Sequence, residues 1–327
     1  MLTPWEIVQK EMIPPARFVS KNLTGVLILL KIMLFQRGAG GGLDEQPGRR
    51  NYVRPARKYD LPCFQAGMKN FSRNKKYLRP TLYCNCRAPE ITAMAQELGA
   101  GRKSDHEFAE AAYEFTKRNI AIEMMPLDGV ECTLSRGTGT CVQKISLFVA
   151  LCRAAGIPAR FRFCSLSDLG TWLDRPLQNA PLLQKWLIAM GDFMLHGEGE
   201  ALIDGQWLTA DISVEPLWQA AHGLPVTRLG ESSVGHWMFP VPGSTFTRES
   251  VTLGMGTSTR ILFKHLVPGS LPGFNLGVEE QVEKGRRTVA AAGGEAAYDA
   301  EARRRLVPAA SRADLVRDHD NIVFGGK

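Results

Sequence analysis

The sequence predicts an α+β fold in which a buried helix packs against an antiparallel sheet. Three observations support this prediction: a helical apolar pattern that begins at Cys141, an alternating strand pattern after it, and an Asp-Gly dipeptide between two later strand patterns. The four segments are residues 141–155, 159–163, 194–202 and 206–214. Because Asp-Gly is typical of two-residue hairpin turns, the last two segments are expected to pair as antiparallel neighbours.

The composition is that of a globular protein with one unevenly charged end. The hydrophobic fraction of 44% and the charged fraction of 22% exclude a wholly disordered and a membrane-embedded class. The formal net charge of +7 arises in residues 1–77, which hold 14 Lys and Arg but only 5 Asp and Glu. We expect this extension to contact a partner or the surface of a membrane, and we expect no specific nucleic-acid binding.

An apolar run at residues 23–35 is the main feature of this extension. It has 13 residues and contains Lys31, whereas a spanning helix needs about 20 apolar residues, so it is not expected to cross a bilayer. Its basic and small-residue flanks resemble a secretory signal, but the long stretch before it favours a docked helix or a helix on a membrane surface. The glycine-rich residues 38–42 are expected to form a flexible linker.

Regular structure is expected from about Leu78 onward. Helices are predicted at residues 89–98 and 105–118, and Ser104 with Glu107 forms a capping-box pattern at the start of the second helix. The last part of the chain is charged, rich in alanine and helical in pieces. The predicted organisation is a basic extension at residues 1–77, a main domain at 78–270 and a C-terminal tail at 271–327.

The cysteine pattern favours a reducing compartment. Seven cysteines, an odd number, are spread along the chain without the density of a disulfide scaffold. We therefore expect a cytoplasmic protein. Cys84 and Cys86 suggest a metal site, but they lack the two-residue gap and the second ligand pair of zinc sites. No metal ligand and no cofactor are predicted.

Cys141 is the candidate nucleophile. It begins a buried helix directly after the small residues 137–140, which leave room for a substrate carbonyl. Because the free N–H groups and the dipole of a helix N-terminus favour a thiolate, a lowered thiol pKa is expected. The alternative is that Cys141 only packs the start of the helix, as Cys152 is expected to do farther along.

A nucleophilic cysteine requires a base and a group that orients the base, and the predicted hairpin offers both. If Asp204 and Gly205 form the turn, the strand register places Asp211 opposite Glu198. His196 lies two residues before Glu198 and therefore on the same face of the sheet. His196 and Asp211 are then diagonal neighbours within reach of each other.

Three stretches of the chain resemble the transglutaminase-like (transglutaminase core) superfamily. They are Gly139-Thr-Cys141, the run Leu-Cys-Arg-Ala-Ala-Gly-Ile-Pro-Ala-Arg that ends at Arg160, and His196 leading through Trp207 to Asp211. The resemblance covers about residues 78–240. It implies a papain-like, transglutaminase-like cysteine fold, in which the nucleophile lies at a helix N-terminus packed on an antiparallel sheet that carries His and Asp.

The resemblance also implies a catalytic triad and a reaction. Cys141 is expected to act as the nucleophile, His196 as base and then acid, and Asp211 as the orienting carboxylate. The reaction is acyl transfer on an amide, peptide or isopeptide bond of a peptide or protein, through a thioester, by a hydrolase such as a protease or by a transglutaminase-type transferase. The alternative is a non-catalytic transglutaminase-like binding or scaffolding module. Glu198 departs from the family pattern, which often has an aromatic residue at this place.

Overall fold

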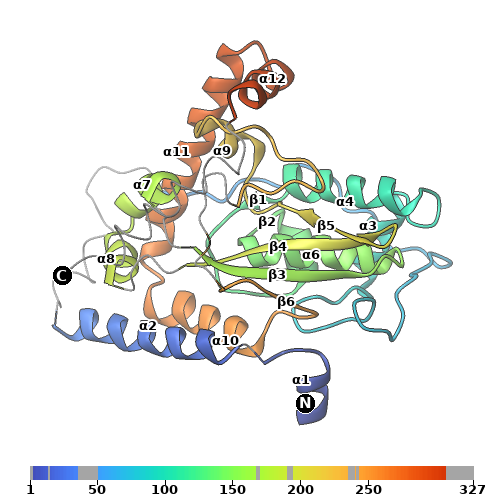
Figure 1. The fold of residues 1–327 in the computed structure, drawn as a ribbon, viewed down its shortest axis with the longest axis horizontal. Helices are drawn as coiled ribbons and strands as arrows, with labels where there is room; N and C mark the ends of the chain where they lie inside the picture. The colour runs from blue at the N-terminus through green and yellow to red at the C-terminus, as the bar shows by residue number, and fades with distance from the viewer. Residues whose placement is uncertain are drawn as a thin grey trace.

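The described residues form a four-stranded sheet, a short pair of parallel strands and the helices that surround them (Figure 1). The computed structural model describes residues 3–13, 15–35, 51–166, 170–189, 194–234, 240 and 243–306. The predicted linker at residues 38–42 lies outside the described residues. The helices of the first half are α1 (Pro4–Gln9), α2 (Ala16–Phe35), α3 (Pro89–Glu97), α4 (Asp105–Asn119), α5 (Val130–Arg136) and α6 (Cys141–Ala154). The later helices are α7 (Gly170–Gln178), α8 (Pro181–Ala189), α9 (Pro216–Ala221), α10 (Leu253–Ile261), the π-helix η1 (Leu262–Leu266), α11 (Ser270–Ala291) and α12 (Glu295–Arg305).

The sheet has the strand order β5-β4-β3-β6, and every neighbouring pair is antiparallel. Its strands are β3 (Ala159–Leu166), β4 (Met194–Ile203), β5 (Gln206–Ala210) and β6 (Phe246–Arg248), while β1 (Ala121–Ile122) and β2 (Thr138–Gly139) form the parallel pair. The predicted hairpin is confirmed, because Ile203 pairs with Gln206 around the Asp204-Gly205 turn. The predicted strand at 206–214 is too long. β5 is an edge strand, so the residues after Ala210 have no second neighbour to hold them extended, and Asp211 lies just beyond the strand.

Helix α6 packs against one face of the sheet, where glycines and phenylalanines alternate between neighbouring strands. Phe163 of β3 pairs with Gly197 of β4, and Phe161 pairs with Gly199. A Cβ atom added at Gly197 would lie 2.9 Å from the Cδ1 atom of Ile145 on α6. Because side chains alternate along a strand, His196 before Gly197 and Glu198 after it point to the opposite face.

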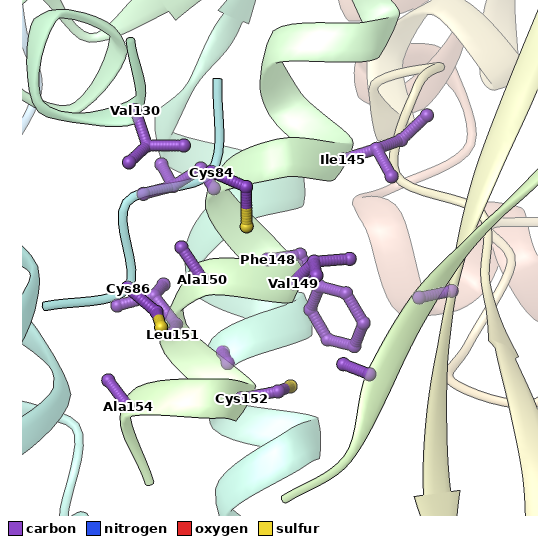
Figure 2. Close-up of a cluster of buried hydrophobic side chains, with 14 of the residues drawn as sticks. Cys84, Cys86, Val130, Ile145, Phe148, Val149, Ala150, Leu151, Cys152 and Ala154 are labelled. Carbon is purple, nitrogen blue, oxygen red and sulfur yellow. The ribbon is translucent and has the colours of Figure 1, made fainter. Parts of the chain in front are cut away.

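The first core surrounds α6, which α3, α4 and α5 contact on the side away from the sheet. Figure 2 shows Cys84, Cys86 and Cys152 among the apolar side chains of this cluster. The predicted helices at 89–98 and 105–118 are confirmed within a residue at each end. The capping box between Ser104 and Glu107 is present at the start of α4. The first core therefore fixes α6, and with it the position of Cys141.

A second core joins helices from both ends of the chain. Leu29 of α2, Leu173 of α7, Leu183 of α8 and Phe274 of α11 belong to one buried cluster. Trp186 of α8 donates its indole N–H to a backbone carbonyl of α2, at 2.8 Å. In agreement with the expectation for residues 23–35, no helix in the described part of the chain is long and apolar enough to cross a bilayer.

Glycines allow α11 to lie against the main chain of its neighbours. A Cβ atom added at Gly273 would lie 1.9 Å from the carbonyl oxygen of Asn179, and one at Gly285 would lie 1.6 Å from the carbonyl oxygen of Leu217. Gly277 faces the main chain of α7 in the same way. Since α11 begins at the predicted boundary between domain and tail, this close packing links the two segments. The domain boundaries themselves stay predictions.

Candidate active site

Cys141 is the first residue of α6, and its position is fixed by a capping box. Thr140 is the N-cap: its hydroxyl accepts from the Gln143 N–H at 3.3 Å, and the Gln143 side chain accepts from the Thr140 N–H at 2.9 Å. The Cys141 side chain is partly buried and packs against the first core. Of the first-turn N–H groups, those of Cys141 and Val142 act on the sulfur, whereas the Gln143 N–H donates to Thr140.

The predicted lowering of the Cys141 pKa is wrong. Burial raises the pKa of the Cys141 thiol to about 11, while the backbone N–H of Val142 and the amine of Lys144 act in the opposite direction. The free-energy cost of removing the thiolate from water is larger here than the stabilisation that the helix N-terminus provides. The cysteine is therefore a neutral thiol near pH 7, and it requires a base at the moment of attack.

Lys144 lies one turn after Cys141 and is fully buried, which the sequence did not indicate. Its Nζ atom has no hydrogen-bond partner among the described residues. Burial lowers the pKa of Lys144 to about 8, and the carboxylate of Glu215 opposes this shift. When it is protonated, the Lys144 amine is a nearby positive charge that lowers the pKa of the Cys141 thiol.

His196, Glu198 and Asp211 form a buried cluster on the sheet face opposite α6. Each offers one ligand atom, and these atoms all lie within 4.8 Å of one another. The exposed fractions are 2% for His196, 3% for Glu198 and 0% for Asp211. Burial lowers the pKa of His196, and the neighbouring Asp211 carboxylate acts against this. The imidazole is therefore neutral near pH 7 and able to accept a proton.

Asp211 is anchored by hydrogen bonds on one carboxylate oxygen and on its carbonyl oxygen. Its Oδ2 atom accepts from the backbone N–H of Ser233 at 2.8 Å and from the Ser233 hydroxyl. Its carbonyl oxygen accepts from Lys117 Nζ at 3.1 Å, and this amine also donates to Tyr113 at 2.9 Å. These contacts hold the carboxylate at the end of β5 although it lies outside the strand.

Two polar atoms of the cluster lack partners and complement each other. Neither His196 Nε2 nor Asp211 Oδ1 has a hydrogen-bond partner in the described part of the chain. A hydrogen bond from a protonated Nε2 to Oδ1 would satisfy both groups. Nδ1 would then remain to accept a proton from a substrate or a thiol.

Cys141 and His196 line the same cavity, which has a volume of about 370 Å³. Ser213, whose hydroxyl donates to the Gly197 carbonyl at 2.8 Å, lines it beside them. Among the described residues, no hydrogen bond joins Cys141 to His196 or His196 to Asp211. The structure thus brings His196 and Asp211 together and brings Cys141 to the same cavity, with the imidazole and the sulfur not yet in contact.

Residues 92–212 match the family model described as the transglutaminase-like superfamily. This part of the chain is similar to the core of that superfamily. This segment includes all three candidate residues, Cys141, His196 and Asp211. A comparison with curated proteins finds no match.

Among solved structures, a "Putative Cysteine Protease" from Cytophaga hutchinsonii is 17% identical to this chain. The comparison covers 52% of this chain and 49% of that one, with a TM-score of 0.33. The chain therefore spans about half the length of that protein. A likeness of this size carries no argument about the transglutaminase-like core or its chemistry.

The buried cluster is also a set of side chains of the types that bind metal ions. Nevertheless, protein groups already satisfy much of it: Asp211 accepts from Ser233, and Glu198 accepts from Ser232 and, at 3.1 Å, from Arg162. The remaining unpartnered atoms, one nitrogen and one oxygen, suit each other. The arrangement thus fits an imidazole that is oriented by a carboxylate, and it does not require a bound cation.

In the sequence, Glu198 departs from the family pattern and lies opposite Asp211 in the hairpin register. A contact between these two carboxyl groups therefore follows from the register. Ser233 had no such signal, because the loop after α9 folds back over the cluster through contacts distant in sequence. Lys144 was visible only as a cation inside an apolar helix.

Glu198→Gln is expected to stabilise the protein at pH 8 and to change little at pH 5. Burial and the Asp211 charge raise the pKa of Glu198 to about 7. The native state therefore holds this proton more tightly than the unfolded chain, and stability from it is lost as pH rises from about 4.5 to 7. Removing the carboxyl is expected to recover up to about 3 kcal/mol above pH 7.

Urea unfolding of the wild type and of Glu198→Gln at pH 5 and pH 8 measures this effect. The quantity of interest is how much the stability difference between the two proteins changes from pH 5 to pH 8. Titrating groups outside the cluster of His196, Glu198 and Asp211 cancel in the comparison. An equal stability difference at the two pH values would show that Glu198 does not hold a proton in the native state. Glu200→Gln, on the same face and paired with Arg160 at 2.5 Å, is the matched control.

Proposed function

We propose that the chain catalyses acyl transfer from an amide, peptide or isopeptide bond through a thioester on Cys141. The observation that carries the proposal is that Cys141, at the N-terminus of α6, and His196, beside Asp211, line one cavity. The match to the transglutaminase-like superfamily supports a cysteine-dependent reaction. Peptides and proteins are the substrates that this bond class implies.

The charge states of the two groups determine how the reaction begins. Because the thiol and the imidazole are both neutral near pH 7, His196 accepts the thiol proton as the sulfur attacks the carbonyl carbon. This step requires the imidazole to move within hydrogen-bond distance of the sulfur, and Asp211 stabilises the imidazolium that results. The N–H group of Cys141 at the start of α6 is placed to donate to the oxyanion.

The intermediate then collapses to products. The bond to the leaving amine breaks, the amine takes the proton from His196, and the acyl group remains on Cys141 as a thioester. Water or a second amine attacks this thioester and restores the thiol. Since both acceptors use the same proton path, the residues of the site favour neither hydrolysis nor transfer.

The test is to trap the thioester on the full chain. The protein is incubated with a peptide library, quenched in acid and digested with trypsin, and the peptide of residues 137–144 is examined by mass spectrometry. A hydroxylamine-sensitive acyl adduct on this peptide is expected, and Cys141→Ala is the blank. Cys63→Ala, at an exposed cysteine, is the matched control and should keep the adduct. No adduct from any amide or activated ester would overturn the proposal in favour of a binding module.

A second function, contact with a membrane surface, is favoured by one observation on α2. Leu23, Leu27 and Leu34 are 61%, 68% and 60% exposed, and their spacing places them on one side of the helix. We propose that this face lies on an anionic bilayer surface, attracted by the basic residues of the N-terminal extension.

Sedimentation with vesicles tests this contact. Binding to phosphatidylserine-containing vesicles is expected, and replacing one of the three leucines by serine should weaken it about tenfold. Vesicles of phosphatidylcholine alone are the control for the charge contribution. Equal recovery in the supernatant with and without anionic vesicles would end the idea.

A further inference from the structure

The cavity beside Cys141 is almost entirely apolar. Apart from Cys141 and His196, the polar side chains that line it are Thr140, Ser213 and a Ser-Thr pair on α10. In the described part of the chain, no Lys, Arg, Asp or Glu side chain lines it. Its volume of about 370 Å³ lies in the range of small-molecule binding sites.

Half of the residues that line the cavity lie outside the matched segment. Val26 and Leu29 of α2, Leu262 of η1 and Phe274 of α11 line the cavity, and all lie beyond residues 92–212. The apolar lining therefore combines side chains of the matched segment with side chains that this chain adds to it. Cys141 and His196 lie at one wall of the space that both enclose.

The lining determines what can enter. A polar or charged group placed there would lose its contacts with water and find few partners, which costs several kcal/mol for each group. A hydrocarbon chain loses nothing and gains from burial. A carbonyl carbon at Cys141 would therefore carry its apolar part into the cavity and leave its polar part outside.

We infer that the acyl donor of this enzyme carries an apolar hydrocarbon group, which binds in the cavity while its carbonyl lies at Cys141. This inference rests on the proposed function. With an ester as donor, the Cys141 sulfur bonds to the carbonyl carbon, the bond from carbon to the leaving oxygen breaks, and the alcohol leaves with the thiol proton. Water then releases the carboxylic acid and restores the thiol.

The test uses p-nitrophenyl esters of linear acids from acetate to decanoate, below their micelle concentrations. The rate of Cys141 acylation is followed by p-nitrophenolate release, with the adduct on residues 137–144 checked by mass and Cys141→Ala as the blank. The rate constant is expected to rise about fourfold for each added methylene until the cavity is filled. Esters of N-acetylated glycine, leucine and phenylalanine show whether a fatty chain or an apolar amino acid fits better.

Two substitutions on α2 locate the effect in the cavity. Val26 lines the cavity and is 38% exposed, so Val26→Trp can fill its edge without overpacking the core. This variant is expected to lower the ratio of decanoate to acetate rates at least tenfold. Leu27→Trp, at the neighbouring exposed position, should leave the ratio unchanged.

The outcomes separate the two proposals. Acylation of Cys141 at a rate independent of chain length, or a ratio that Val26→Trp leaves intact, overturns the apolar donor and leaves acyl transfer standing. The absence of any Cys141 adduct, acetyl included, overturns acyl transfer itself. A rate constant that rises with acyl chain length in the wild type but not in Val26→Trp supports both acyl transfer and the apolar donor.

Discussion

His196→Ala is expected to slow acylation of Cys141 by about 10²- to 10⁴-fold near pH 7. The reason is the charge state of the sulfur: with a pKa raised to about 11 by burial, almost none of it is thiolate at neutral pH. Near pH 7, attack by the sulfur on a carbonyl carbon therefore depends on a base beside the thiol. The measurement is the single-turnover rate of p-nitrophenolate release, with Cys141→Ala subtracted.

The pH profile distinguishes loss of a base from loss of structure. Because burial lowers the pKa of His196, the wild-type rate should be constant from about pH 7 upward. In His196→Ala the rate should instead rise about tenfold per pH unit toward pH 11, as the free thiolate takes over. His106→Ala, at an exposed histidine on α4, is the control and should keep the wild-type profile.

The rate at which iodoacetamide alkylates Cys141 shows directly whether His196 activates the sulfur. If Cys141 reacts at the same rate in the wild type and in His196→Ala, the imidazole does not assist the sulfur. The chain would then be a binding module that keeps a cysteine for packing. The adduct must be assigned to residues 137–144, since Cys63 and Cys132 are exposed and also react.

Arg153→Met is expected to destabilise the protein by about 3 kcal/mol or more. Arg153 is 0% exposed and donates to the carbonyl oxygens of Ala159 at 2.8 Å, Arg79 at 2.9 Å and Glu249 at 2.6 Å. Methionine fills similar space but leaves these three buried carbonyls without a donor. Each unsatisfied group costs about 1–3 kcal/mol, which exceeds what removal of the buried charge recovers.

Urea unfolding at pH 7 measures this loss, with the slope checked for two-state behaviour. Arg73→Ala, at an exposed arginine, is the control and should change stability by less than about 0.5 kcal/mol. Arg153→Lys should recover only part of the loss, because an ammonium cannot reach three separate carbonyls as the planar guanidinium does. Full recovery with lysine would show that charge, and not this geometry, holds the segments together.

The local features of the site were predictable because local rules determine them. The start of α6 at Cys141 follows from small residues before an apolar helical pattern, and the Asp-Gly turn sets the hairpin register that brings His196 near Asp211. The thiol pKa was predicted in the wrong direction because the helix N-terminus is visible in the sequence, whereas burial depends on segments far from Cys141.

The apolar cavity was not predictable for the same reason. Its walls combine α2 with α8 and α11, which follow α2 by more than a hundred residues and meet it only through tertiary packing. The apolar run at 23–35 gave the helix but not its partner. Trp186, which binds the α2 backbone, shows no sign of that role in its own neighbourhood.

The glycines of α11 fix one side of the cavity through close main-chain packing, whereas Val26 of α2 lines another side and is partly exposed. Phe274 lines the cavity and lies between Gly273 and Gly277, where the main chain of α11 contacts the main chain of neighbouring segments. A side chain added at either glycine would displace the whole helix. Relatives with larger or smaller acyl donors are therefore expected to differ at the positions of α2 that face the cavity. If the proposed acyl transfer holds, the length of the acyl chain that fits the cavity would be encoded in α2, some hundred residues before Cys141.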